Sequence, residues 1–233
     1  MKKFYFITYL LFFLLFQGQS QNVRFGVKGG GNLLALSGPN KPQTYEKQYG
    51  FSGGAFIDTR VTEYLSSQVE LSFTRYNFQF SQAIDNIEDA YFNIKEKNDY
   101  ITVPLVLKYK RGYEVAFYYL SAGLQGAVQI KQKRDVNATS RDRIIDFKTY
   151  YNYKNNWYDY GVNFGAGFQF KTVTIGITYY YSMRNLYTNK DAWEMRYKAL
   201  SLNMSWQFNY KNRYPYGRKS GWKGFKYKIK NLF

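Results

Sequence analysis

Apolar and polar residues alternate with a period of two along most of this chain. Such alternation is typical of a β-strand that presents one apolar and one polar face. The clearest example runs from Tyr158 to Gln169, where aromatic and aliphatic residues alternate with Asp, Gly, Asn and Gln. Helical periodicity is almost absent before residue 209, so the pattern predicts an all-β fold. The segments predicted to be strands are 23–28, 51–58, 65–74, 101–109, 120–130, 158–169, 173–181 and 200–208.

The two faces of these predicted strands differ in size and polarity. One face is bulky and apolar, and the other carries Gly, Ser, Gln and charged residues. Small and polar residues suit the interior of a narrow barrel whose apolar face meets lipid. We therefore predict an eight-stranded antiparallel up-and-down transmembrane β-barrel, because a tilted strand needs about 9–11 residues to cross a bilayer. A soluble, lipocalin-like periplasmic barrel stays open as an alternative, with its apolar residues pointing inward. The aromatic residues expected at a membrane interface are Tyr158, Tyr160, Tyr179, Tyr181 and Trp206.

The predicted connections alternate between short and long. Outer-membrane barrels have short periplasmic turns and longer outer loops, so we expect the long connections to face the outside. The short turns are predicted near Thr62–Glu63, Arg111–Gly112 and Lys171. The long, polar loops are predicted at about 35–49, 81–99, 132–157 and 185–196.

The N-terminal segment has the features of a secretory signal peptide. Lys2 and Lys3 form a positive head, residues 4–16 are apolar, and Gly18 and Ser20 are small residues before a cleavage site. The apolar stretch is too short to span a bilayer as a helix. The predicted organisation is a signal peptide at 1–20, an outer-membrane β-barrel at 21–208 and a basic periplasmic tail at 209–233.

The composition narrows the candidate chemistry. The chain has no cysteine and no histidine, so it lacks disulfides, a lipoprotein anchor, the usual general base and the commonest metal ligand. Aromatic residues make up 21% of the chain although its mean hydropathy is −0.52, which fits an apolar outer band around a polar interior. The net charge of +17 would suit nucleic acid, but an exported protein is not expected to meet it. We expect no cofactor, no metal site and no catalytic residue.

Several charged residues fall on the face predicted to point inward. An eight-stranded barrel has room for side chains but hardly for a channel. We therefore expect an internal network of salt bridges and hydrogen bonds that satisfies these charges. A narrow proton or ion path, or a small polar ligand site, is the functional alternative. The residues of this predicted network are Arg24, Lys28, Asp58, Arg60, Glu70 and Lys108.

Seven short motifs along the predicted strands carry a family resemblance. They are Arg24–Leu33, Gly50–Phe56, Gln68–Leu71, Tyr100–Tyr109, Ala122–Leu124, Gly161–Gly167 and Leu200–Phe208. In this order they resemble the PorT-like outer-membrane β-barrel family of Bacteroidetes-type bacteria, over about residues 22–208. The resemblance implies a fold and an outer-membrane address. The namesake branch takes part in protein secretion, but this chain is more similar to generic members, and that role is not transferred.

The predicted function is that of a non-enzymatic barrel with a structural or surface-interaction role. Its partners would be outer-membrane lipid, with anionic headgroups or a surface partner at the long basic loops. Residues 131–157 carry seven cations and three carboxylates, which predicts a solvated cationic surface. A transport or secretion-associated role is the alternative. Outer-membrane enzymes resemble one another in relying on a histidine, and the carboxylate pair Asp142 and Asp146 is the remaining candidate for catalysis.

The predicted tail contains eight cations and no acidic residue. Trp222, Phe225 and Ile229 fall on one face of a helix, and a basic helix with such a face would lie in the membrane interface. An added strand and a disordered basic tail are the alternatives. We expect the tail to emerge on the periplasmic side, since eight strands return the chain to the side on which it started.

Overall fold

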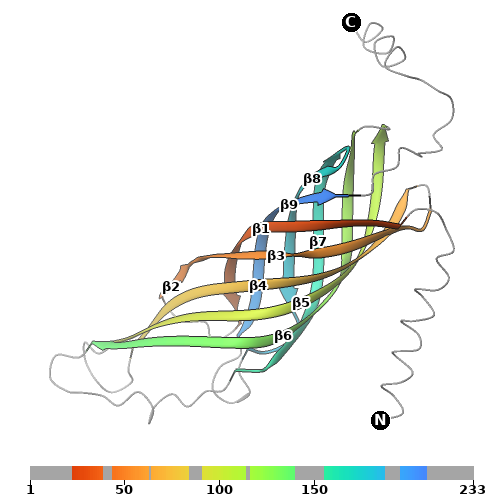
Figure 1. Ribbon diagram of the computed structural model, residues 1–233. Coiled ribbons are helices and arrows are strands. Elements are labelled where there is room, and N and C mark those ends of the chain that lie inside the picture. The colour runs from red at the N-terminus through yellow and green to blue at the C-terminus, as the bar shows by residue number, and fades with distance from the viewer. Residues whose placement is uncertain are drawn as a thin grey trace, which may run out of the picture.

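The computed structural model describes residues 23–38, 44–62, 64–83, 91–113, 116–139, 155–186 and 195–208. These residues form nine antiparallel strands (Figure 1). Among them, no helix is long and apolar enough to cross a membrane. The strands are β1 (Val23–Ser37), β2 (Thr44–Lys47), β3 (Tyr49–Arg60), β4 (Leu65–Ala83), β5 (Tyr91–Tyr113), β6 (Ala116–Thr139), β7 (Tyr158–Phe170), β8 (Val173–Ser182) and β9 (Arg196–Gln207).

Eight of the nine strands close into a barrel. Each pairs with its neighbour along the chain, and β1 pairs with β9 from Gly26–Gln207 to Ser37–Arg196. Every barrel strand therefore has a partner on both sides, which removes the open edges of a flat sheet. The short strand β2 is the ninth, and it pairs with β4 at Phe78–Ser81. The predicted antiparallel up-and-down fold is confirmed.

The outward face of the barrel is an apolar belt. Along each strand, exposed apolar residues alternate with buried or half-buried polar ones. A soluble barrel would need a charged outward face, whereas the outward face here is apolar. The belt comprises Phe25, Val27, Phe51, Ile57, Val69, Leu71, Val103, Leu105, Leu107, Leu120, Leu124, Val128, Ile130, Tyr160, Phe164, Phe168, Ile175, Ile177, Leu200, Leu202 and Met204.

The strands are of very unequal length. β4, β5 and β6 contain 19, 23 and 24 residues, whereas β7, β8 and β9 contain 13, 10 and 12. About ten residues suffice to cross a bilayer, so the three long strands continue well beyond the belt. In Figure 1 the ends of β5 and β6 reach further to the lower left than the other strands do. We call residues 75–83, 91–99 and 131–139 the outer extension.

Two segments predicted as loops are partly strands of the outer extension. The loop expected at 81–99 is a strand over residues 91–99, and the loop expected at 132–157 is a strand over 132–139. The alternation was missed because both faces of these segments carry polar or aromatic residues. A solvated loop was therefore the wrong description of the cations in β6, and one of them, Arg134, is partly buried on the inward side.

The predicted turns agree with the structure at two of three places. β3 and β4 join through Val61–Tyr64, and β7 and β8 join at Lys171, whose φ is 49°. The turn predicted at Arg111–Gly112 is wrong, because both residues pair within the β5–β6 ladder. β5 continues to Tyr113, and β6 begins at Ala116.

Three predicted features lie outside the described residues. These are the signal peptide at 1–20, the carboxylates Asp142 and Asp146, and the basic tail at 209–233 with its proposed anchors Trp222, Phe225 and Ile229.

Candidate functional site

A first tier of charges fills the lumen near the tight turns. The Lys110 ammonium donates to both oxygens of Asp58, at 3.0 and 3.2 Å, and the Ser66 hydroxyl donates to Asp58 at 3.1 Å. Arg24 and Arg60 line the same small pocket. Asp58 is almost fully buried, so its charge depends on these partners.

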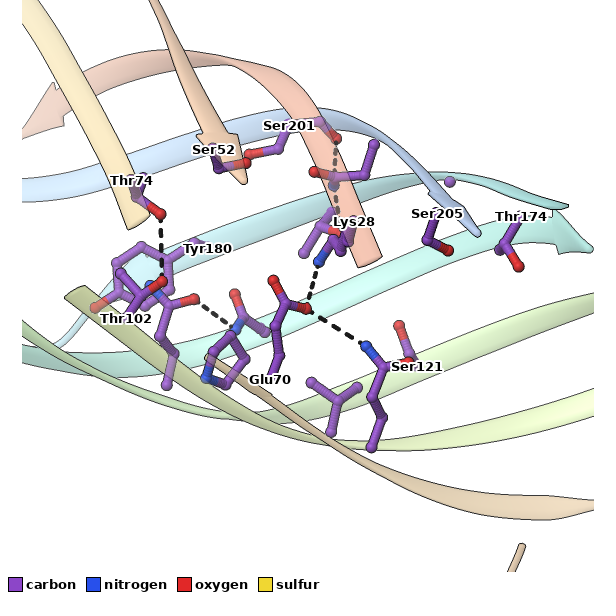
Figure 2. A pocket seen from close by; sticks show the side chains of 18 of the residues that line it. Lys28, Ser52, Glu70, Thr74, Thr102, Ser121, Thr174, Tyr180, Ser201 and Ser205 are labelled. Carbon is purple, nitrogen blue, oxygen red and sulfur yellow. Dashed lines mark hydrogen bonds and ion pairs between the residues drawn. The ribbon is translucent and has the colours of Figure 1, made fainter. Parts of the chain in front are cut away.

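A second tier of charges lies deeper in the lumen, further from the tight turns. The Lys28 ammonium contacts the Glu70 carboxylate at 2.8 Å, and Ser72 and Gln68 also donate to that carboxylate. The Lys108 ammonium donates to Gln68 and lies 4.9 Å from the centre of the Tyr119 ring. Figure 2 shows this contact between Lys28 and Glu70.

The second tier lines a polar cavity of about 70 Å³ (Figure 2). Serine and threonine hydroxyls from several strands surround it, and Thr74 and Thr102 form a hydrogen bond at 3.2 Å. The side-chain oxygen of Asn163 is buried there with no protein partner. A polar space of this size can hold a few water molecules that satisfy such groups.

The structure divides the six residues of the predicted network between these two tiers. Arg24, Asp58 and Arg60 lie together near the tight turns, and Lys28, Glu70 and Lys108 line the cavity. The sequence interpretation missed Lys110, the closest cation to Asp58. It shares the inward parity of Lys108 but lies one residue past the predicted end of its strand.

An aromatic plug closes the lumen on the side away from the tight turns. The rings of Tyr76, Tyr100 and Tyr197 lie with their centres 5.7–6.2 Å apart. All three are at most 5% exposed, and Phe78 packs against Tyr197 at 6.1 Å. Asn98 donates to the Tyr197 hydroxyl at 2.9 Å. The plug was not expected, because the predicted interior held only small, polar and charged residues.

Beyond the plug, a buried carboxylate ties the outer extension together. Glu96 on β5 accepts from Arg134 on β6 at 2.5 Å and from Asn155 at 3.3 Å. Asn98 also donates to Glu96, at 3.3 Å. Since Glu96 is almost fully buried, its charge is supported by these three donors.

The outward face of the outer extension is cationic. Lys95, Lys97, Lys131 and Lys133 are exposed there, and the exposed Asp135 lies opposite Lys95. Asp99 is engaged by Arg75, which donates to both of its oxygens at 2.6 and 2.8 Å. This guanidinium holds the pKa of the Asp99 carboxyl below its usual range.

A scan against protein families matches residues 17–188 to the outer membrane protein beta-barrel domain. The chain belongs to this family. Together with the apolar belt, membership of this outer-membrane barrel family places the protein in the outer membrane. No curated protein matches the chain in sequence.

Solved structures of small outer-membrane barrels are similar to this family member. Ail, the attachment invasion locus protein of Yersinia pestis, shares 12% identity at a TM-score of 0.40, over 81% of this chain and 100% of that one. Neisserial surface protein A shares 14% at 0.42, over 81% and 100%. OprG of Pseudomonas aeruginosa shares 9% at 0.43, over 80% and 96%. At such identities a likeness concerns the fold alone.

The buried carboxylates of the lumen and of the outer extension are held by neighbouring side chains. Within the described residues, no group of three or more potential metal ligands comes together. The buried carboxylates Asp58, Glu70 and Glu96 are each bonded to a cation. Such pairs hold strands together in this barrel. A further buried carboxylate, Asp159, accepts hydrogen bonds from the hydroxyls of Tyr180 and Ser182 at 2.9 and 2.5 Å.

Proposed function

We propose that this outer-membrane barrel is non-enzymatic and holds a cationic surface for interaction outside the cell. The observation that carries the proposal is the contrast between lumen and extension. Two charged tiers and an aromatic plug fill the lumen, whereas three strands continue beyond the belt, and two of them, β5 and β6, carry lysines on their outward face. The barrel then serves as a membrane anchor for the outer extension.

We also infer the orientation of the barrel in the membrane and its route of export. The tight turns face the periplasm and the outer extension faces the outside, following the usual loop asymmetry of such barrels. Residues 1–20 act as a signal peptide that is cleaved before Gln21. The order of motifs supports a place among the generic PorT-like members, with no transfer of the secretion role.

Single cysteines test this orientation, because the chain has none of its own. Lys95→Cys lies on the outer extension, and Thr172→Cys, in the β7–β8 turn, is its matched control. We expect a membrane-impermeant maleimide to label Lys95→Cys on whole cells and Thr172→Cys only after the outer membrane is permeabilised. Labelling of Thr172→Cys alone on whole cells would invert the topology and overturn the proposal.

A transport role is the second candidate, and the polar cavity favours it. A path would have to pass Tyr76, Tyr100 and Tyr197 on one side and the Asp58–Lys110 pair on the other. Both barriers consist of buried side chains in mutual contact. Conductance in planar bilayers separates this candidate from the first.

The tail at 209–233 is proposed to rest on the periplasmic leaflet, with Trp222, Phe225 and Ile229 as interfacial anchors. Fluorescence of Trp222 tests this, once Trp157, Trp193 and Trp206 are replaced by Phe. We expect a blue shift in vesicles that grows with their content of anionic lipid. A water-like emission maximum in every lipid would mean that the tail does not dock.

A further inference from the structure

Three lysines gather on the outward face of the outer extension. Lys97 on β5 and Lys133 on β6 are direct partners in the antiparallel register, and Lys131 lies two residues from Lys133 on the same face. Side chains directly opposite on one face have Cβ atoms about 4.5–5.5 Å apart. We call Lys97, Lys131 and Lys133 the lysine triad.

The lysine triad has a surplus of positive charge at short range. Like charges directly opposite in a sheet repel each other, as Lys97 and Lys133 do. The register partner of Lys131 is Asp99, but Arg75 occupies both of the Asp99 oxygens. An anion with several acceptor oxygens could accept hydrogen bonds from all three ammonium groups and relieve the repulsion.

The triad lies where the apolar belt ends. Asp99 pairs with Lys131 and Tyr100 pairs with Gln129, which leaves Ile130 as the extra residue of a β-bulge. Ile130 is 56% exposed and belongs to the belt. A bulge redirects the side chains that follow it, and here lysines replace apolar residues within one step. The polar headgroup layer follows the hydrocarbon core of a bilayer at the same place.

We propose that the lysine triad binds the phosphate of an anionic lipid headgroup. The triad offers charge and donors, and the belt fixes its height at the headgroup layer. This inference rests on the proposed function, since it needs an embedded barrel whose extension stands beyond the membrane. An acidic protein partner would not require the triad to sit at the belt, so the lipid is the occupant that the position favours.

A tryptophan beside the triad can report which lipid lies there. The full mature chain carries I130W, with Trp157, Trp193, Trp206 and Trp222 replaced by Phe, and is reconstituted in vesicles of phosphatidylcholine and phosphatidic acid. Bromine is placed either on phosphatidylcholine or on phosphatidic acid. The quenching of the fluorescence of the tryptophan at position 130 by each brominated lipid is then compared. We expect phosphatidic acid to be enriched at least about fivefold, because lysines near a membrane surface attract anionic lipid strongly and salt weakens that attraction.

Two variants that lose the same charge locate the effect. In K97Q/K131Q/K133Q, both brominated lipids should quench the tryptophan equally. In K47Q/R111Q/K171Q, the enrichment of phosphatidic acid should remain. A heat-dependent shift on a denaturing gel shows that each variant is folded. Enrichment that persists in the first variant, or disappears equally in both, would overturn the assignment to the triad.

Added salts, and the quenching by each lipid, distinguish the remaining possibilities. Loss of enrichment in inorganic phosphate, but not in chloride of equal ionic strength, would mean that the triad prefers a free phosphate ion and would overturn the lipid assignment. Equal quenching by both lipids in the unaltered triad would overturn the inference and leave the proposed function intact. No quenching by either lipid would place residue 130 outside the membrane, and the proposed function would then fail.

Discussion

At the scale of single residues, the lumen is built from charges that depend on one another. Asp58 and Lys110 are both at most 9% exposed, and the Lys110 Nζ lies 3.0 Å from the Asp58 Oδ2. Removing one member of such a pair leaves the other uncompensated, which costs far more than removing both. Arg24 and Arg60 nearby make an unpaired Lys110 especially unfavourable.

The Asp58–Lys110 pair should therefore show strong coupling. We expect Asp58→Asn to lower the free energy of unfolding by about 3 kcal/mol, and Lys110→Met in the same chain to restore most of that loss. Urea unfolding of the barrel in lipid vesicles measures all four members of this cycle. Additive losses, with the double variant the least stable, would show that the two side chains act independently.

Two glycines on neighbouring strands offer a second test at this scale. A Cβ at Gly161 would lie against the carbonyl oxygen of Tyr181 on β8, whereas one at Gly126 on β6 would meet nothing within 4 Å. We expect Gly161→Ala to cost about 1–3 kcal/mol through overpacking and Gly126→Ala to cost nothing or to stabilise slightly. The same urea titration compares them. Equal losses would assign the effect to the backbone rather than to the close approach.

At the scale of elements, the outer extension has its own support. It lies beyond the belt, so the hydrocarbon core of the bilayer does not stabilise it, and Glu96 joins β5 to Arg134 of β6 and to Asn155. Hydrogen bonds to a charged group contribute about 1.5–3 kcal/mol each. Loss of this carboxylate should loosen the extension without affecting the strands in the membrane.

Glu96→Gln is the test of this support. We expect amide hydrogen exchange in residues 91–99 and 131–139 to accelerate about 30-fold, which corresponds to about 2 kcal/mol. Exchange in the belt part of β6, residues 116–128, should stay the same. Lys95→Gln, on the outward face of the same strand, is the control and should change neither region. Acceleration throughout β6 would mean that extension and belt unfold together.

The strands themselves were readable from the sequence, and their ends were not. A period of two with a large difference between faces marks the part of each strand that meets lipid, as in Tyr158–Gln169. Beyond the belt that difference disappears, because Phe78 points inward while Gln79 faces the solvent. The alternation that places Thr74 inward continues through Tyr76 and Phe78. It could therefore have predicted that these two residues point into the lumen. Ring contacts between Tyr100 and Tyr197 depend on strands far apart in the chain, and no local pattern contains them.

At the scale of the whole molecule, the lumen is blocked in three successive layers. The Asp58–Lys110 tier lies near the tight turns, the Lys28–Glu70 tier follows, and the tyrosine plug closes the far side. The cavity between them has room for a few water molecules only. An eight-stranded barrel is too narrow to conduct unless its side chains leave the lumen.

The intact barrel should therefore not conduct. In planar bilayers we expect no discrete current steps from the purified protein at concentrations that give many insertions. Tyr76→Ala/Tyr100→Ala/Tyr197→Ala removes the plug alone and should also stay closed, because the two charged tiers remain. Regular single-channel steps from the unaltered protein would favour the transport role instead.

The unequal heights of the strands also leave one margin of the outer extension without a paired strand among the described residues. β2 covers the outer end of β4, but β7 accompanies β6 only as far as Val128, and no strand of the described chain pairs with that side of β6 up to Thr139. An uncovered strand edge invites the same edge of another copy, and lysines are a common protection against such pairing. Lys131 and Lys133 are exposed on this margin. We expect their charges to oppose self-assembly into a continuous sheet, and a form without them to collect as oligomers at the membrane surface.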